Sequence, residues 1–375
     1  FVTNPAVTVR DGSGNGVGGV NVRYSSRLSG ASGTFPGGRR DTSIVTDDNG
    51  LAVAPRFTAN TTAGAHSVTA SVDGISQSAE FSLTNAADRP WSITSTGGTP
   101  QAAQVNTDFA APFKATVRDT FGNAVPNRTV TFVVPSSGPS GSFVFGVHDY
   151  VTSDSGVATA NTFRANSLAG AYVVRATVSG LTPVASYDLT NSVGTPGNIA
   201  IIKGTPQTAI VNTRFDSVLS VRVTDASGNP VSGLNVTFTA PSSGASGTFV
   251  SNGATTKIVQ TSPLGIANAD TFKANAIAGG PYLVTAAAAG VSGEVTFNIT
   301  NIVGPLSAFL VEAENGGAIS TQLAMNSFNI RITAQDFYHN PIQSFAGPVR
   351  ISSTASFLGD TTTGGFTDGV VIHRN

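Results

Sequence analysis

The sequence contains no cysteine, which excludes disulfide bonds, thiolate metal sites and cysteine nucleophiles. Charged residues are scarce, at 11%, and the net charge is −1, so the chain lacks the basic surface that nucleic-acid binding requires. No apolar run is long enough to cross a membrane, and the residues after Phe1 do not have the pattern of a signal peptide. We therefore expect no nucleic-acid partner and no membrane insertion in this segment.

The abundant residues are those of strands and turns. The chain has 42 Gly and 19 Pro, and its hydrophobic content of 40% argues against disorder. No window of twelve residues shows a helical apolar stripe, whereas short segments alternate apolar and polar residues between Gly, Pro, Ser and Asn. The sequence predicts an all-β protein.

A set of short motifs recurs with a period of about 107 residues, which indicates duplicated domains. The motif SGASGTF begins at Ser29, and related motifs begin at Ser137 and Ser243. The motif FSLTN ends at Asn85, and related motifs end at Asn191 and Asn301. The sequence predicts four domains, namely 1–86, 87–192, 193–302 and 303–375.

The stretch VRDGSGNGVGG contains Gly14-Asn-Gly-Val-Gly-Gly19, which fits the glycine pattern of a phosphate-binding loop. That pattern needs a following helix, and the residues after Gly19 alternate as a strand does. What recurs is instead D-x-x-[G/H]-N-x-[V/I], with its Asp at positions 11, 119, 225 and 336. In such a motif the Asp accepts hydrogen bonds from amides two or three residues on, and the Gly adopts a left-handed backbone. The motif predicts a β-turn.

Each repeat has the size and rhythm of an immunoglobulin-like sandwich, with seven or eight short strands in about a hundred residues. Without disulfides the core rests on apolar side chains, each contributing roughly 1.5–3 kcal/mol when buried. The core residues that we predict for the second repeat are Val117, Val130, Phe132, Val174 and Leu189.

The linkers between repeats are short, and each contains a proline. They are AADRP, SVGTPGN and IVGPLS, and they follow Asn85, Asn191 and Asn301. Short, proline-containing linkers limit bending, so we expect the repeats to form an elongated rod.

Several of these motifs resemble those of a known family. VTDASGNPVSGLNVTFTAPSSGASGTF, GIANADTFKANAIAGG and FNITN look like the bacterial Ig-like domain, group 1, of invasin- and intimin-like adhesins, over residues 1–302. Residues 309–349 resemble a different Ig-like repeat of bacterial surface proteins. The resemblance implies a stalk at the cell surface or outside the cell that holds an adhesive head, which these residues do not contain.

Both ends of the sequence fall inside a repeat. Phe1 aligns with Phe109, and the fourth repeat stops about 35 residues short of a complete sandwich. We expect a piece of a longer protein, or else chains that complete one another by donating strands, in which case residues 1–375 would self-associate.

Candidate metal ligands have simpler explanations. His66 occupies the repeat position of Tyr172 and Tyr282, which predicts a half-buried strand residue. The stretch TDDNG at 46–50 resembles part of a calcium loop, but Asp48 aligns with Pro263, which predicts a turn without metal. We predict no metal and no cofactor.

Catalytic arrangements are equally weak. The chain has no G-x-S-x-G elbow, the recurring Asp is explained by turn chemistry, and Lys114 does not recur as a Lys–Asn cross-link would require. Trp91 is the only Trp and lies in a linker, so no aromatic platform for carbohydrate is present. We predict that the protein is not an enzyme and is the stalk of an adhesin, with a subunit of an extracellular filament or sheath as the alternative. The expected partners are other protein chains, namely neighbouring domains, further copies or a host receptor.

Overall fold

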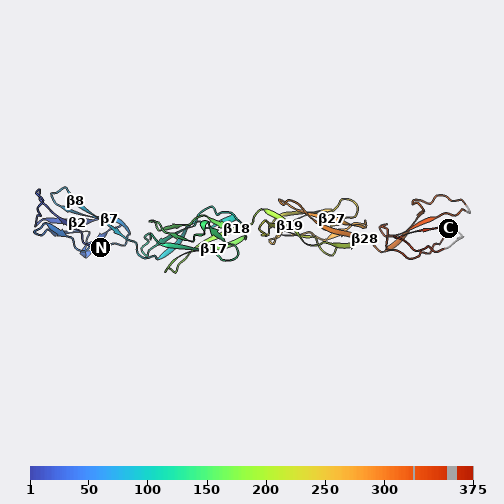
Figure 1. Cartoon of the computed structure of the whole chain (residues 1–375), viewed down its shortest axis with the longest axis horizontal. Helices are drawn as coiled ribbons and strands as arrows, with labels where there is room; N and C mark the ends of the chain where they lie inside the picture. The colour runs from blue at the N-terminus through green and yellow to red at the C-terminus, as the bar shows by residue number, and fades with distance from the viewer. Residues whose placement is uncertain (324–325, 353–360, 375) are drawn as a thin grey trace. The chain divides into compact units, whose positions relative to one another are not determined.

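The computed structural model describes residues 1–323, 326–352 and 361–374. Within them the chain is all-β, with two three-residue 3-10 turns, η1 (Pro36–Gly38) and η2 (Val144–Gly146) (Figure 1). The chain divides into two compact units, Phe1–Ser192 and Val193–Asn375. The predicted division into four domains, with boundaries at 86/87, 192/193 and 302/303, stays a prediction. We refer to residues 1–86, 87–192, 193–302 and 303–375 as the first to fourth repeats.

The second repeat is a β-sandwich. A five-stranded sheet of order β10-β18-β17-β12-β14 packs against a three-stranded sheet of order β15-β11-β9, and β13 pairs with β16. The strands are β9 (Ser92–Gly97), β10 (Gln101–Gln104), β11 (Lys114–Arg118), β12 (Thr129–Val133), β13 (Gly141–Phe143), β14 (Asp149–Val151), β15 (Val157–Thr159), β16 (Phe163–Ala165), β17 (Gly170–Val178) and β18 (Ala185–Ser192). The sequence predicted seven or eight strands, whereas the structure has ten: β14 was missed, and β15 and β16 were predicted as one segment.

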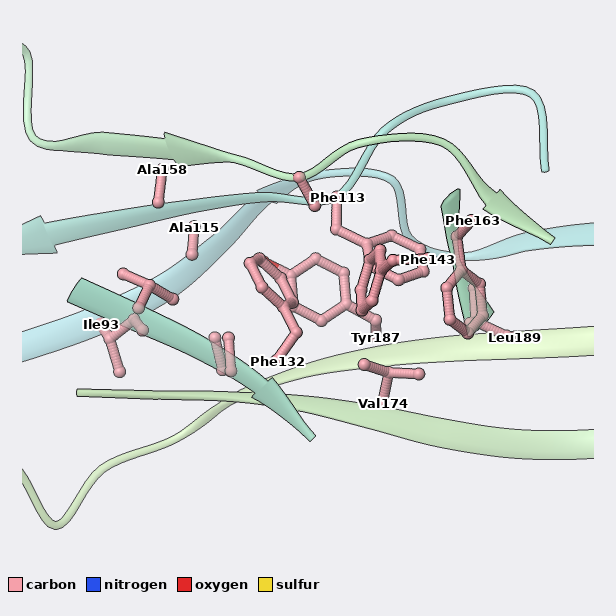
Figure 2. Packing of buried hydrophobic residues seen from close by; sticks show 14 of the residues in the cluster. Ile93, Phe113, Ala115, Phe132, Phe143, Ala158, Phe163, Val174, Tyr187 and Leu189 are labelled. Atoms are coloured by element: carbon pink, nitrogen blue, oxygen red, sulfur yellow. The ribbon is translucent and has the colours of Figure 1, made fainter. Parts of the chain in front are cut away.

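The core of the second repeat lies between the two sheets, and Phe113 is at its centre (Figure 2). The Phe113 ring centroid lies 5.0 Å from those of both Phe163 and Tyr187. Aromatic pairs at this separation add about 0.5–1.5 kcal/mol to the effect of burial alone. The predicted core residues are confirmed, each with at most 2% of its surface exposed: Val117, Val130, Phe132, Val174 and Leu189.

Strand β17 shows why the sequence folds in this way. Tyr172, Val174, Ala176 and Val178 are buried, and the residues between them point to the other face of the sheet. Successive side chains of a strand point to opposite faces, so a sequence with period two buries one face and leaves the other to solvent.

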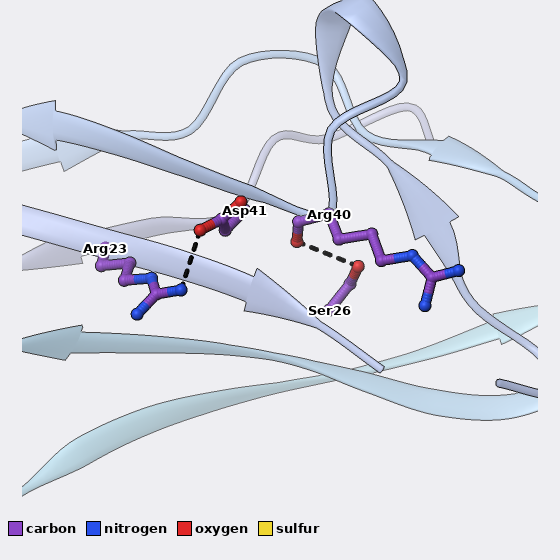
Figure 3. Close-up of polar contacts among 4 residues, drawn as sticks. All are labelled: Arg23, Ser26, Arg40 and Asp41. Atoms are coloured by element: carbon purple, nitrogen blue, oxygen red, sulfur yellow. Dashed lines mark hydrogen bonds and ion pairs between the residues drawn. The ribbon is translucent and has the colours of Figure 1, made fainter. Parts of the chain in front are cut away.

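The first repeat has a four-stranded sheet of order β4-β2-β7-β8 and the pairs β1-β5 and β3-β6. The strands are β1 (Ala6–Thr8), β2 (Asn21–Ser26), β3 (Gly33–Thr34), β4 (Asp41–Val45), β5 (Leu51–Val53), β6 (Thr58–Ala59), β7 (Gly64–Val72) and β8 (Ser78–Asn85). The exposed side chains of Arg23 on β2 and Asp41 on β4 pair at 2.8 Å, and at the end of β2 Ser26 Oγ donates to the Arg40 carbonyl at 3.1 Å (Figure 3). An exposed ion pair of this kind contributes at most about 1 kcal/mol, so the fold rests on the apolar core.

The third repeat has the same plan as the second. Its sheets have the orders β20-β28-β27-β22-β24, β19-β21-β25 and β23-β26. The strands are β19 (Pro196–Lys203), β20 (Gln207–Ile210), β21 (Ser220–Asp225), β22 (Asn235–Thr239), β23 (Gly247–Phe249), β24 (Thr256–Gln260), β25 (Ile266–Asn268), β26 (Phe272–Ala274), β27 (Gly279–Ala288) and β28 (Val295–Ile302). In both repeats a short strand pairs in parallel with the last strand, β10 with β18 and β20 with β28.

The described part of the fourth repeat contains a three-stranded sheet, β29-β30-β31. The strands are β29 (Leu306–Ala313), β30 (Ile330–Asp336) and β31 (Val370–His373). Ile332, Ala334, Ile342 and Phe366 form its buried cluster. Residues 324–325, 353–360 and 375 of this repeat lie outside the described residues.

The recurring SGxSGxF motif has a steric explanation. A Cβ added at Gly141 would lie 2.7 Å from the Phe163 ring and 2.3 Å from the Arg164 carbonyl oxygen. Gly33 and Gly247 have the same relation to Phe57 and Phe272. Only glycine lets these backbones approach so closely, which explains why the motif returns in the first three repeats.

Candidate functional site at the junction between repeats

The D-x-x-[G/H]-N motif forms the predicted turn. In the second repeat, Oδ1 of Asp119 accepts hydrogen bonds from the amides of Phe121 at 2.9 Å and Asn123 at 2.8 Å. The bond from Asn123 comes from an amide four residues after the Asp, and not two or three as predicted, because the turn is a loop of five residues, Asp119 to Asn123. At the Gly position, Gly122 has φ +85° and His339 of the fourth repeat has φ +68°, so both adopt the left-handed backbone that the motif predicts.

The phosphate-loop alternative for Gly14–Gly19 does not fit the structure. The residues that follow form strand β2 (Asn21–Ser26), so the helix N-terminus that would receive a phosphate is not there. Asp11 makes the same turn as Asp119, accepting hydrogen bonds from the amides of Ser13 and Asn15 at 2.9 Å.

The second carboxylate oxygen of the motif Asp holds the linker that enters the repeat. Oδ2 of Asp119 accepts a 3.0 Å hydrogen bond from the amide of Asp88. Oδ2 of Asp336 accepts one of the same length from Gly304. Asp119 and Asp336 are 3% and 1% exposed. A turn signature thus becomes the point where a linker is attached to a sandwich.

These hydrogen bonds control the charge of the carboxyl group. Burial by itself raises the pKa of Asp119, but the hydrogen bonds led by those from the Asn123 side chain and the Asp88 amide outweigh it. The pKa of Asp119 is therefore lowered from its ordinary value of 3.8, and that of Asp336 is lowered for the same reasons. Both groups are anionic acceptors near neutral pH.

The Asn that ends the motif reaches into the preceding repeat. Nδ2 of Asn123 donates a 2.8 Å hydrogen bond to the Thr61 carbonyl, and its Oδ1 accepts a 2.9 Å bond from the Ala63 amide. Its Nδ2 also donates to Oδ2 of Asp119 at 2.8 Å, so the linker, the turn and the preceding repeat share one network. We call the contact of this Asn with the two backbone groups the asparagine clasp.

The same clasp occurs in the second unit. Nδ2 of Asn340 donates to the Ala276 carbonyl at 2.8 Å, and its Oδ1 accepts from the Ala278 amide at 2.9 Å. An additional contact joins these two repeats, because Nδ2 of Asn212 donates a hydrogen bond to the Tyr338 hydroxyl. Sequence reasoning identified the turn but missed the clasp. The recurrence of both the motif Asn and the A-N-x-x-A segment was the signal that could have found it.

The histidine and calcium candidates lie elsewhere. His66 is 5% exposed and not half-buried as predicted, because its ring packs against those of Phe1 and Phe57, whose centroids lie 5.8 and 6.1 Å away. In the 46–50 stretch, Oδ1 of Asp47 accepts hydrogen bonds from the amides of Asn49 and Leu51, both at 2.9 Å. These are the hydrogen bonds of a turn. Within the described ranges, no group of three or more His, Asp or Glu could hold a metal ion.

No family model matches the chain. Its fold is similar to that of FdeC, an Escherichia coli adhesin, at 18% identity over 80% of this chain and 94% of that one, with a TM-score of 0.47. It is also similar to InvD of Yersinia pseudotuberculosis, at 17% identity, 90% and 89% coverage and a TM-score of 0.43. A third similar structure is invasin, a bacterial integrin-binding protein, at 17% identity, 100% and 71% coverage and a TM-score of 0.43.

The sheets described above have the immunoglobulin-like sandwich architecture that the motifs predicted. Among residues 1–323, 326–352 and 361–374, no helix has the length and apolar character needed to span a membrane.

Proposed function

We propose that this chain is the stalk of a bacterial cell-surface adhesin, in which tandem Ig-like domains with boundaries at 86/87, 192/193 and 302/303 give reach and stiffness. The observation that carries this proposal is the asparagine clasp. It joins Asn123 to the first repeat and Asn340 to the third with matching bonds of 2.8 and 2.9 Å. Two repeats that are connected by a linker alone can swing, whereas a buried Asp and a clasp at the same place restrict that motion.

The chemistry of the chain fits this role. The chain is poor in charged residues, at 11%, and the two junctions described above are built from backbone groups, side-chain amides and the motif Asp carboxylates. The adhesive head that a stalk would carry, its receptor and an extracellular location belong to the same proposal.

Small-angle X-ray scattering of residues 1–375 tests the mechanical part. We expect the wild-type chain to scatter as a stiff particle. A variant with both Asn123→Ala and Asn340→Ala should show a wider distribution of particle dimensions at unchanged secondary structure. Scattering from the wild type that matches freely jointed domains would contradict the proposal. Immunolabelling of intact source cells tests the location.

A filament or sheath subunit is the second candidate, in which a neighbouring chain would pair with β8. The last strands β18 and β28 each pair with a parallel strand, whereas β8 is the edge strand of the first repeat's sheet. A neighbouring chain could add a strand there. Concentration-dependent growth in light scattering would support this candidate, and a monodisperse monomer would exclude it.

A further inference from the structure

One peptide unit at the first junction is held from both ends by side chains of two different repeats. Its carbonyl, on Thr62, accepts a 3.0 Å hydrogen bond from Nδ2 of Asn85, the last residue of β8. Its N–H, on Ala63, donates the 2.9 Å bond to Oδ1 of Asn123 that forms half of the clasp. A peptide unit is planar and stiff, so a side chain that fixes its carbonyl also fixes the direction of its N–H.

The second unit repeats this arrangement with different residues. The Ile277 carbonyl accepts a 3.0 Å hydrogen bond from Nδ2 of Asn301, and the Ala278 amide of the same peptide unit donates to Oδ1 of Asn340 at 2.9 Å. Asn85 and Asn301 are the Asn residues that close the FSLTN and FNITN motifs. The recurrence indicates that the shared peptide unit is a feature of the junction.

Asn85 is well placed to hold this peptide unit. It is 5% exposed, and the two hydrogens of its Nδ2 are shared among the Thr62 carbonyl, the Ser32 carbonyl at 2.8 Å and Oδ1 of Asn60 at 3.0 Å. These bonds tie the loop that carries Thr62 to the interior of the first repeat. Hydrogen bonds at the two ends of one amide also polarise each other, which strengthens both.

We infer that Asn85 and Asn301 are positioning residues for the junction that follows them, acting through the shared peptide unit to set how firmly the next repeat is clasped. The clasp between a repeat and the next one is then fully formed only when the last strand of the first of the two is folded in place. Without Asn85, the loop would have to be ordered by the clasp itself, at a cost in conformational entropy. The inference concerns the same junction as the proposed stalk, but it holds or fails independently of surface location.

The absence of cysteine allows a direct test on the full chain, because spin labels attach only to introduced thiols. Ser43→Cys on β4 and Ser186→Cys on β18 replace exposed residues on either side of the first junction. Pulsed electron paramagnetic resonance then gives the distribution of distances between the two labels. We expect Asn123→Ala and Asn85→Ala each to broaden this distribution, and the double variant to be no broader than the broader single variant.

Asn191→Ala is the matched control. Asn191 holds the equivalent loop of the second repeat, with Nδ2 bonds to Ser140 and Leu168 of 2.9 and 3.0 Å. We therefore expect it to leave the distance distribution at the first junction unchanged. An Asn85→Ala chain with a folded first repeat and an unchanged distribution, or broadening that adds in the double variant, would overturn the inference. A broad distribution in the wild type would instead count against the proposed stalk.

A second measurement serves if Asn85→Ala unfolds the first repeat. Coupling between two sites is reciprocal, so weakening the clasp must also weaken the bond of Asn85 to Thr62. Asn123 is a half-buried turn residue. We expect Asn123→Ala to accelerate hydrogen exchange of the Asn85 side-chain amide by up to about tenfold, which corresponds to the loss of one hydrogen bond. The Asn191 side chain should be unaffected. Unchanged exchange at Asn85 would refute the coupling.

Discussion

The amide of Gly304 donates a 3.0 Å hydrogen bond to Oδ2 of Asp336, a residue 32 positions later in the chain. The same bond of the same length connects Asp88 to Asp119. In each case a linker residue is fixed to the turn that carries the clasp. The recurring Asp therefore both shapes its own turn and attaches the linker, and its loss should affect both.

Asp336→Asn and Asp119→Asn should each destabilise the chain. Each replaces a buried anionic acceptor of several hydrogen bonds by a neutral amide, at a cost of about 1.5–3 kcal/mol per charged hydrogen bond lost. Urea unfolding followed by circular dichroism measures the change. Asp48→Asn is the control, because Asp48 is an exposed residue of the 46–50 turn, and we expect its effect to stay within about 0.5 kcal/mol.

We expect the free energy of unfolding to decrease only at acid pH, below the ordinary pKa of an aspartate. The pKa values of Asp119, Asp225 and Asp336 are lowered from 3.8 because the hydrogen bonds of the turn outweigh the effect of burial. The unfolded chain then binds more protons than the folded chain between the folded and unfolded pKa values, so stability rises with pH there. The contribution is complete above about pH 4 and is lost as the pH falls through the lowered values. Thermal unfolding across this range tests it, and the pH dependence should be shallower in Asp336→Asn.

Gly141→Ala should destabilise the second repeat by about 3 kcal/mol or more, because the new Cβ would lie 2.3 Å from a backbone carbonyl oxygen that cannot move freely. Gly12→Ala is the control, since no atom lies within 4 Å of the position that its new Cβ would occupy and its φ is not in the left-handed region. Thermal unfolding distinguishes the two. Equal effects of the two substitutions would show that the close approach of Gly141 to Phe163 has no steric importance.

Two tyrosines at the same repeat position should respond differently to loss of their hydroxyl. The Tyr282 hydroxyl donates a 2.9 Å hydrogen bond to Oδ1 of Asn301, whereas the buried Tyr172 hydroxyl has no hydrogen-bond partner among the described residues. Tyr282→Phe should therefore cost about 1 kcal/mol, and Tyr172→Phe should be neutral or stabilising. Urea unfolding of both variants gives the comparison, and a larger loss for Tyr172→Phe would contradict it.

Much of the fold could be predicted from local sequence. The alternation of Tyr172, Val174, Ala176 and Val178 fixes which face of β17 is buried, because strand geometry has a period of two. Strand β14 was missed, and β15 and β16 were not separated, because segments of three residues are too short to show a period. The burial of His66 was also missed, since it depends on Phe1 and Phe57, which lie outside its strand β7 and which the period of that strand does not reveal.

By itself, the sequence determined the repeat, the all-β class, the core positions and the turn at each motif Asp, because these depend on neighbours within a few residues. Only the tertiary structure decided that Asn123 and Asn340 bind the preceding repeat. It also decided that Asn85 and Asn301 bind the carbonyls of the same peptide units. Those bonds join residues more than twenty positions apart. Every residue has a backbone carbonyl, and every residue except proline a backbone amide, so the sequence does not show which side chain will bind them.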